Sequence, residues 1–141
     1  MDNKELEVFE YFVDSRPDFQ REVKRLIRKK KFNTLQKQID ELMSDLERGQ
    51  FNGTCLTVSD VPVPHKIYKL RLPNPDAGVG KSDGYRVVYV VITEHKIVVL
   101  LTIYYKKEQA TITDHEIKLL LEGYLMSLLI EESDDEESDD T

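Results

Sequence analysis

Residues 67–107 hold three consecutive stretches of strand character, and this block constrains the fold more than any other part of the chain. The strands are predicted from residue 65 or 67 to 72, at 84–93 and at 96–105, where β-branched and aromatic residues are frequent. The second and third strands are joined across Glu94 and His95, which predicts a hairpin. Residues 97–103 are apolar without alternation, which is typical of a strand buried on both faces. The sheet therefore needs cover on both sides.

Three runs with helical periodicity are available to provide that cover. Apolar residues recur at helical spacing in 19–27 and 35–46, and Gly49 follows the second run where a helix is expected to end. These two runs predict a helical hairpin on one sheet face. A third run follows a Thr113-Asp114 cap and reaches about residue 131. Its apolar residues exceed one stripe, so it either contacts a partner as well as the sheet or is a wholly intramolecular core helix.

The remaining segments complete an α+β prediction for the chain. Residues 7–13 are interpreted as a first strand, with helix as the alternative. Residues 50–64 contain Gly53, Pro62 and Pro64 and are predicted to be a loop. The expected fold is an N-terminal helical hairpin packed on a small, mainly antiparallel twisted sheet of 3–4 strands, followed by a C-terminal helix and a disordered acidic tail.

The net charge of −7 comes from the end of the chain. Eight of the 27 acidic residues lie in 131–141, and the other 19 stand against 20 Lys and Arg in residues 1–130. We therefore predict one domain at 1–130 and an acidic disordered tail at 131–141. The single cysteine, Cys55, excludes an internal disulfide, and no apolar run is long enough to span a bilayer. We expect a cytoplasmic protein that has no membrane partner.

Basic residues gather where the three central strands begin and end. Lys69 and Arg71 are two residues apart in a strand and therefore share a face. Further basic residues precede or begin the second strand and follow the third: Lys81, Arg86, Lys106 and Lys107. Cations presented from one region of a sheet favour a site for a polyanion. A second basic group at 21–31 is either another RNA contact or a solvated helix face.

Three motifs in this order resemble toxins of the RelE/ParE superfamily, including RelE and HigB, from type II toxin–antitoxin modules. They are YKLR at 68–71, GKSDGYRVVY at 80–89 and YYKKEQ at 104–109, and the likeness covers roughly residues 7–130. The resemblance implies a ribosome-dependent mRNA endonuclease that cleaves by 2′-hydroxyl attack, with neither a metal nor another cofactor. It implies as partners a cognate antitoxin, the ribosome and mRNA, and a homodimer through the C-terminal helix is a further possibility.

The same resemblance assigns the site residues. The catalytic candidates are Lys69, Arg71, Arg86 and Lys107, and the RNA-binding candidates are Lys81, Lys106, Tyr104 and Tyr105. One position departs from the family, because the tyrosine that some members carry after the last basic pair aligns near Thr113. This departure puts nuclease activity in question. The alternatives are a ParE-like toxin that inhibits DNA gyrase without cutting RNA and a catalytically inactive binding homologue.

Overall fold

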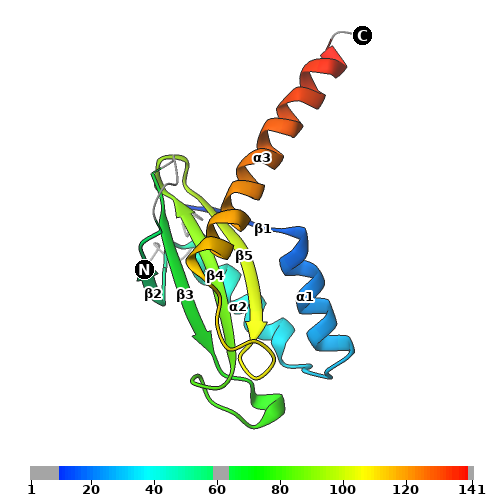
Figure 1. Ribbon diagram of the computed structural model, residues 1–141, viewed down its shortest axis with the longest axis vertical. Helices are drawn as coiled ribbons and strands as arrows, with labels where there is room; N and C mark the ends of the chain where they lie inside the picture. Colours follow the sequence, from blue (N-terminus) through cyan, green and yellow to red (C-terminus); the bar gives the residue numbers. More distant parts are fainter. Residues whose placement is uncertain (1–9, 59–63, 140–141) are drawn as a thin grey trace, which may run out of the picture.

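The computed structural model describes residues 10–58 and 64–139, with side chains described up to residue 130. It contains one five-stranded sheet in the order β1-β5-β4-β3-β2, in which β1 is parallel to β5 and the other pairs are antiparallel (Figure 1). The elements in chain order are β1 (Phe12–Ser15), α1 (Pro17–Arg28), α2 (Leu35–Glu47), β2 (Thr54–Leu56), β3 (Lys66–Leu72), β4 (Tyr85–Ile92), β5 (Ile97–Tyr105) and α3 (Asp114–Asp139). The predicted α+β class is confirmed.

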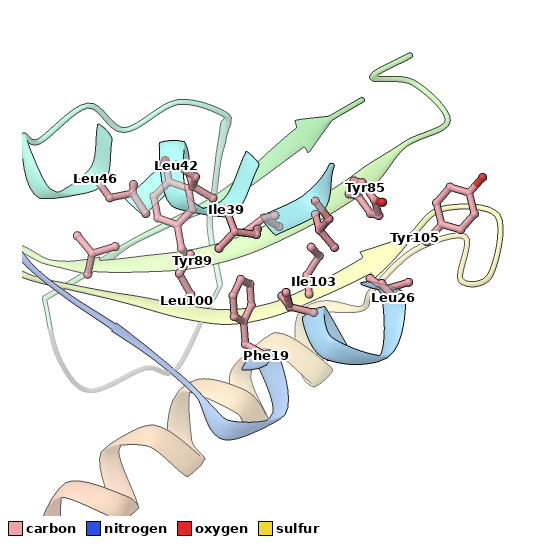
Figure 2. Packing of buried hydrophobic residues seen from close by; sticks show 14 of the residues in the cluster. Phe19, Leu26, Ile39, Leu42, Leu46, Tyr85, Tyr89, Leu100, Ile103 and Tyr105 are labelled. Carbon is pink, nitrogen blue, oxygen red and sulfur yellow. The ribbon is translucent and has the colours of Figure 1, made fainter. Parts of the chain in front are cut away.

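Each face of the sheet has its own hydrophobic core. On one face, Phe19 and Leu26 of α1 and Leu42 of α2 pack against strand residues that include Tyr89 and Leu100 (Figure 2). On the opposite face, apolar residues of α3 pack against β4 and β5, among them Ile117, Leu121 and Tyr124. Complete burial of side chains of this size contributes about 1.5–3 kcal/mol each. The prediction that the helical hairpin and the C-terminal helix cover opposite faces is therefore confirmed.

The register between β4 and β5 changes once. Val88 pairs with Thr102 while Tyr89 pairs with Leu100, so Leu101 is an extra residue in β5 and forms a bulge. Leu101 belongs to the same core as Val99, and Thr102 lies across from Val88 of that core. Leu101 and Thr102 therefore face the same side of the sheet, and the alternation of side chains along β5 is shifted by one residue after the bulge.

The strand count is a correction to the sequence prediction of 3–4 strands. One additional strand, β2, lies inside the predicted loop and pairs with the outer edge of β3, from Thr54 with Lys69 to Leu56 with Ile67. At this edge a Cβ on Gly53 would lie 2.7 Å from the Lys69 carbonyl oxygen, so glycine permits the close approach. The first strand starts at Phe12, and residues 7–9 of the predicted strand lie outside the described residues.

The C-terminal helix is longer than predicted. The sequence predicts that this helix ends at about residue 131, whereas α3 continues to Asp139, and residues 140–141 lie outside the described residues. The segment from 124 onward contains neither glycine nor proline, so nothing in it interrupts a helix. Figure 1 shows the C-terminal half of α3 projecting past the sheet. Among the described residues, no helix has the length and apolarity that crossing a membrane requires.

Candidate functional site

Three side chains form a row across the open end of the sheet, on the face that α3 covers elsewhere. Arg71 of β3 pairs with Arg86 of β4, and Arg86 pairs with Tyr104 of β5. Direct cross-strand partners point to the same face of a sheet, and Lys69 shares it because it precedes Arg71 by two residues. α3 begins beyond this row and runs toward the other end of the strands (Figure 1). The end of this face is therefore left uncovered.

An open pocket of about 310 Å³ lies over this row, and we call it the cationic pocket. Four basic residues and no acidic residue are among its described lining, which consists of Thr54, Leu56, Lys69, Arg71, Arg86, Tyr104, Lys106, Ala110 and Thr111. Cations held close together with no neutralising carboxylate are arranged to receive an anion. The arginines can offer paired N–H groups to a phosphate, and the lysines offer compact point charges.

Arg86 is the most constrained of the four cations. Its side chain is 5% exposed and donates three hydrogen bonds to backbone carbonyls: Nη1 to Lys81 (2.9 Å) and Tyr85 (3.2 Å), and Nη2 to Ser82 (2.9 Å). No carboxylate pairs with it in the described part of the chain. A guanidinium has five N–H donors, so two remain for an anion in the pocket. Arg86 therefore positions the 81–85 turn and contributes charge to the site.

Tyr104 is the buried tyrosine of the row, and its hydroxyl is a polar group of the pocket. Burial raises the pKa of its phenol, while the positive charge of Arg86 acts in the opposite direction and the carboxylate of Glu116 raises it further. A phenol whose pKa lies above its ordinary value of about 10 stays protonated at neutral pH. Tyr104 is therefore a hydrogen-bond donor in this pocket and does not accept a proton from substrate.

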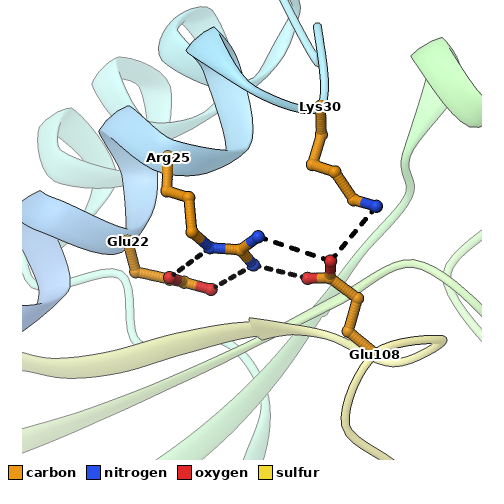
Figure 3. A network of polar contacts seen from close by, with 4 residues as sticks. All are labelled: Glu22, Arg25, Lys30 and Glu108. Carbon is orange, nitrogen blue, oxygen red and sulfur yellow. Dashed lines mark hydrogen bonds and ion pairs between the residues drawn. The ribbon is translucent and has the colours of Figure 1, made fainter.

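The segment that carries Lys106 is tied to α1 by a cluster of ion pairs (Figure 3). Arg25 contacts both Glu22 (2.8 Å) and Glu108 (2.5 Å), and Lys30 lies 3.3 Å from Glu108. Hydrogen bonds from Arg25 and Lys30 lower the pKa of the Glu108 carboxyl, although partial burial acts against them. Arg25 and Lys30 thus hold the chain that follows β5, and Arg21 of the same basic group pairs with Asp18.

The predicted site residues fall into two groups. The structure brings Lys69, Arg71, Arg86, Tyr104 and Lys106 together in the cationic pocket.

The other three candidates lie elsewhere. Tyr105 pairs with Tyr85 and packs in the core on the opposite face, where Phe32 is 5.2 Å away between ring centroids. Lys81 is exposed and lines an adjoining hollow beside α2, which Lys69 and Arg71 also line, while its carbonyl accepts a hydrogen bond from Arg86. Lys107 is exposed next to the pocket but is not part of its lining.

Thr113, at the position where the family tyrosine aligns, has a structural role in this chain. Its hydroxyl accepts from the Glu116 backbone N–H (3.1 Å), and the Glu116 carboxylate accepts from the Thr113 backbone N–H (3.2 Å). This reciprocal pair is a capping box that begins α3.

Sequence reasoning missed the pocket residues that come from loops and from β2. Thr54 and Leu56 reach the site because β2 pairs with β3, and Ala110 and Thr111 lie in the connection to α3. None of the four carries a charge or belongs to a motif that identifies it. Among the described residues, no group of three or more His, Cys, Asp or Glu side chains is placed to hold a metal ion.

The chain is similar to solved structures of the RelE toxin of E. coli, which belongs to the superfamily that the three motifs resemble. The isolated toxin shares 26% identity over 67% of this chain and 83% of that chain, with a TM-score of 0.44. A free RelE variant in which two arginines are replaced by alanine shares 23% identity over 72% and 88%, with a TM-score of 0.46. No protein-family model matches the chain. No match was found among curated proteins.

Proposed function

We propose that this chain is a RelE-like toxin of a type II toxin–antitoxin module and that the cationic pocket cleaves mRNA on the ribosome. The observation that supports this most directly is the row of Arg71, Arg86 and Tyr104, flanked by Lys69 and Lys106, with no carboxylate among the lining residues that the structure describes. The row offers positive charge and hydrogen-bond donors to a phosphodiester. The three motifs that resemble the superfamily supply residues to the same pocket.

The proposed reaction is attack of a ribose 2′-hydroxyl on the adjacent phosphate, which forms a 2′,3′-cyclic phosphate as the P–O5′ bond breaks and the 5′-oxygen takes a proton from a protonated lysine of the pocket. Negative charge grows on the phosphoryl oxygens, and donors fixed in advance at that point lower the barrier. Arg71 is exposed and is the proposed phosphate clamp, because a guanidinium binds two phosphate oxygens at once. Arg86 adds charge from a fixed position, and Tyr104 donates a hydrogen bond to a phosphoryl oxygen.

Proton transfer is assigned to the pocket lysines. The 2′-hydroxyl must lose a proton as it attacks, and Lys69 and Lys106 are the side chains of the lining that can take it once they are neutral. Lys69→Arg and Lys106→Arg each keep the charge but replace an amine with a guanidinium, which stays protonated and cannot act as a proton acceptor. If one of these lysines accepts the proton, its arginine variant is expected to lose the increase of the cleavage rate with pH. The arginine variant of the other lysine is expected to keep that increase.

The proposed partners follow from this function. A cognate antitoxin would neutralise the toxin, and the ribosome with its mRNA would be the substrate. A homodimer through α3 is the alternative to a partner protein on that helix, and sedimentation of the full chain distinguishes a dimer from a monomer. We propose no metal or organic cofactor for the reaction.

A translation extract supplied with a defined mRNA tests the nuclease directly. We expect codon-linked cuts with the wild-type chain and a loss of about 10²–10³ in rate for Arg71→Ala, the range seen when one transition-state donor is removed. Lys37→Ala on the exposed surface of α2 removes one charge away from the pocket and is expected to cut normally. Equal cutting by Arg71→Ala and Lys37→Ala would contradict the assignment of the pocket.

The same experiment separates the two alternatives. Intact mRNA together with gyrase-dependent DNA breaks would identify a ParE-like gyrase inhibitor. Intact mRNA, intact DNA and normal growth on expression would identify an inactive binding homologue.

A further inference from the structure

α3 carries a second apolar stripe on the side that faces away from the sheet. Leu119, Met126 and Ile130 lie at spacings of 7 and 4 residues, and their exposed fractions are 53%, 57% and 58%. At about 100° per residue, these three side chains point within about 40° of one another. Leu129 flanks them and is 58% exposed. We call these four residues the outer stripe.

The side of α3 that faces the sheet already packs against β4 and β5. Ile117, Leu121 and Tyr124 are buried against the sheet, and they lie on the opposite side of α3 from the outer stripe. Arg16 also holds α3, because its Nη1 donates to the Ser127 hydroxyl at 3.2 Å. Single exposed apolar residues are ordinary on a protein surface, but an aligned stripe is typical of a contact surface. The outer stripe is therefore available to another molecule.

The charges along α3 indicate what kind of molecule fits. The stripe is followed immediately in the sequence by residues 131–141, which contain eight acidic residues and no basic one. A second copy packed antiparallel would bring this acidic run against Asp114, Glu116 and Glu122, and a parallel copy would bring two acidic runs together. Like charges at such contacts oppose association. A helix with its own apolar stripe and a basic end has the complementary pattern.

We propose that the outer stripe and the acidic run together bind a basic amphipathic helix of a partner protein. The stripe provides the apolar contact, and the acidic run selects a positively charged partner and fixes its direction along α3. α3 begins near the cationic pocket and leads away from it, so the docked helix leaves the pocket open (Figure 1). The inference is independent of the nuclease proposal, because it uses no pocket residue.

The test measures binding of labelled peptides to the full chain by fluorescence anisotropy. The probes are an amphipathic Leu/Lys helix of about 18 residues, a scrambled peptide of the same composition and an amphipathic Leu/Glu helix. We expect the amphipathic Leu/Lys helix to bind at least about tenfold more tightly than either other peptide. Met126→Gln combined with Ile130→Gln is expected to weaken this binding about tenfold, and Lys37→Gln on α2 is the matched control.

Salt dependence and oligomeric state complete the test. We expect binding of the Leu/Lys helix to weaken when salt is raised from about 0.05 to 0.5 M, because the acidic run is screened. Sedimentation is expected to show a monomer, and a labelled RNA is expected to bind equally with and without peptide. The inference is overturned if no peptide binds, if the double variant binds as wild type does, or if α3 forms a dimer that the double variant abolishes.

Discussion

Arg86→Ala is the substitution that best separates a structural role from a chemical one in the cationic pocket. It removes three hydrogen bonds from a charged donor to the carbonyls of Lys81, Ser82 and Tyr85. Hydrogen bonds to charged groups contribute about 1.5–3 kcal/mol each. Lys81 and Ser82 are exposed, so water replaces much of what they lose, whereas Tyr85 is buried. The substitution also relieves up to about 1 kcal/mol of repulsion from Arg71 across the strands.

The balance of these effects is a loss of about 3 kcal/mol in the free energy of unfolding. For a chain of this size, such a loss lowers the melting temperature by about 10 °C. Arg71→Ala is the matched variant, because it removes the same charge from an exposed position, relieves the same repulsion and is expected to change stability by no more than about 1 kcal/mol. Both variants are expected to lose nuclease activity.

Calorimetry and urea unfolding measure the stability difference, and amide hydrogen exchange locates it. In Arg86→Ala, exchange is expected to accelerate first in the turn at 81–84 and at the start of β4, while the α1 and α2 core stays protected. If Arg86→Ala and Arg71→Ala unfold at the same temperature, the carbonyl contacts of Arg86 do not stabilise the turn and the reasoning fails.

Three further predictions concern the scaffold around the pocket. Gly84→Ala is expected to unfold the protein at room temperature, because its Cβ would lie 2.1 Å from a β3 carbonyl oxygen, whereas Gly80→Ala meets nothing within 4 Å and should melt as wild type. Glu108→Gln is expected to cost about 1 kcal/mol at pH 7. Since the Glu108 pKa is lowered in the folded state, this stabilisation is present above the unfolded value of about 4.5 and is lost as pH falls through the folded pKa, so the two proteins should converge in acid melts. Leu121→Ala is expected to lower the free energy of unfolding by about 3 kcal/mol, because this α3 side chain is fully buried against the sheet. An unchanged urea midpoint would contradict that packing.

Periodicity in the sequence predicted the helices and central strands because those patterns are local. Phe19, Val23 and Leu26 follow one another at helical spacing within a single helix, and all three side chains are buried in the core as expected. β2 could not be predicted, since three residues after Gly53 become a strand only when the edge of β3 lies beside them. The end of α3 could not be predicted from charge alone, because the acidic run contains neither glycine nor proline to end the helix.

The pocket was predictable as a set of cations but not as an arrangement. Lys69 and Arg71 share a face by strand alternation alone, and this part of the expectation needed no tertiary information. The bonds of Arg86 to carbonyls depend on the course of the 81–85 turn, which no sequence period reports. Strict alternation along β5 also could not decide between Tyr104 and Tyr105, because it takes no account of the bulge at Leu101.

That bulge determines which changes in chain length this fold can tolerate. Loss of Leu101 would leave a regular strand in which Tyr104 still faces the pocket and Tyr105 still faces the core. Loss of Ile103 would instead move Tyr105 into the position of Tyr104 and Lys106 into the core position of Tyr105, which would bury a charged side chain. Homologues that differ by one residue in β5 should therefore carry the difference at the bulge, and a designer who shortens this strand has one safe position at which to do so.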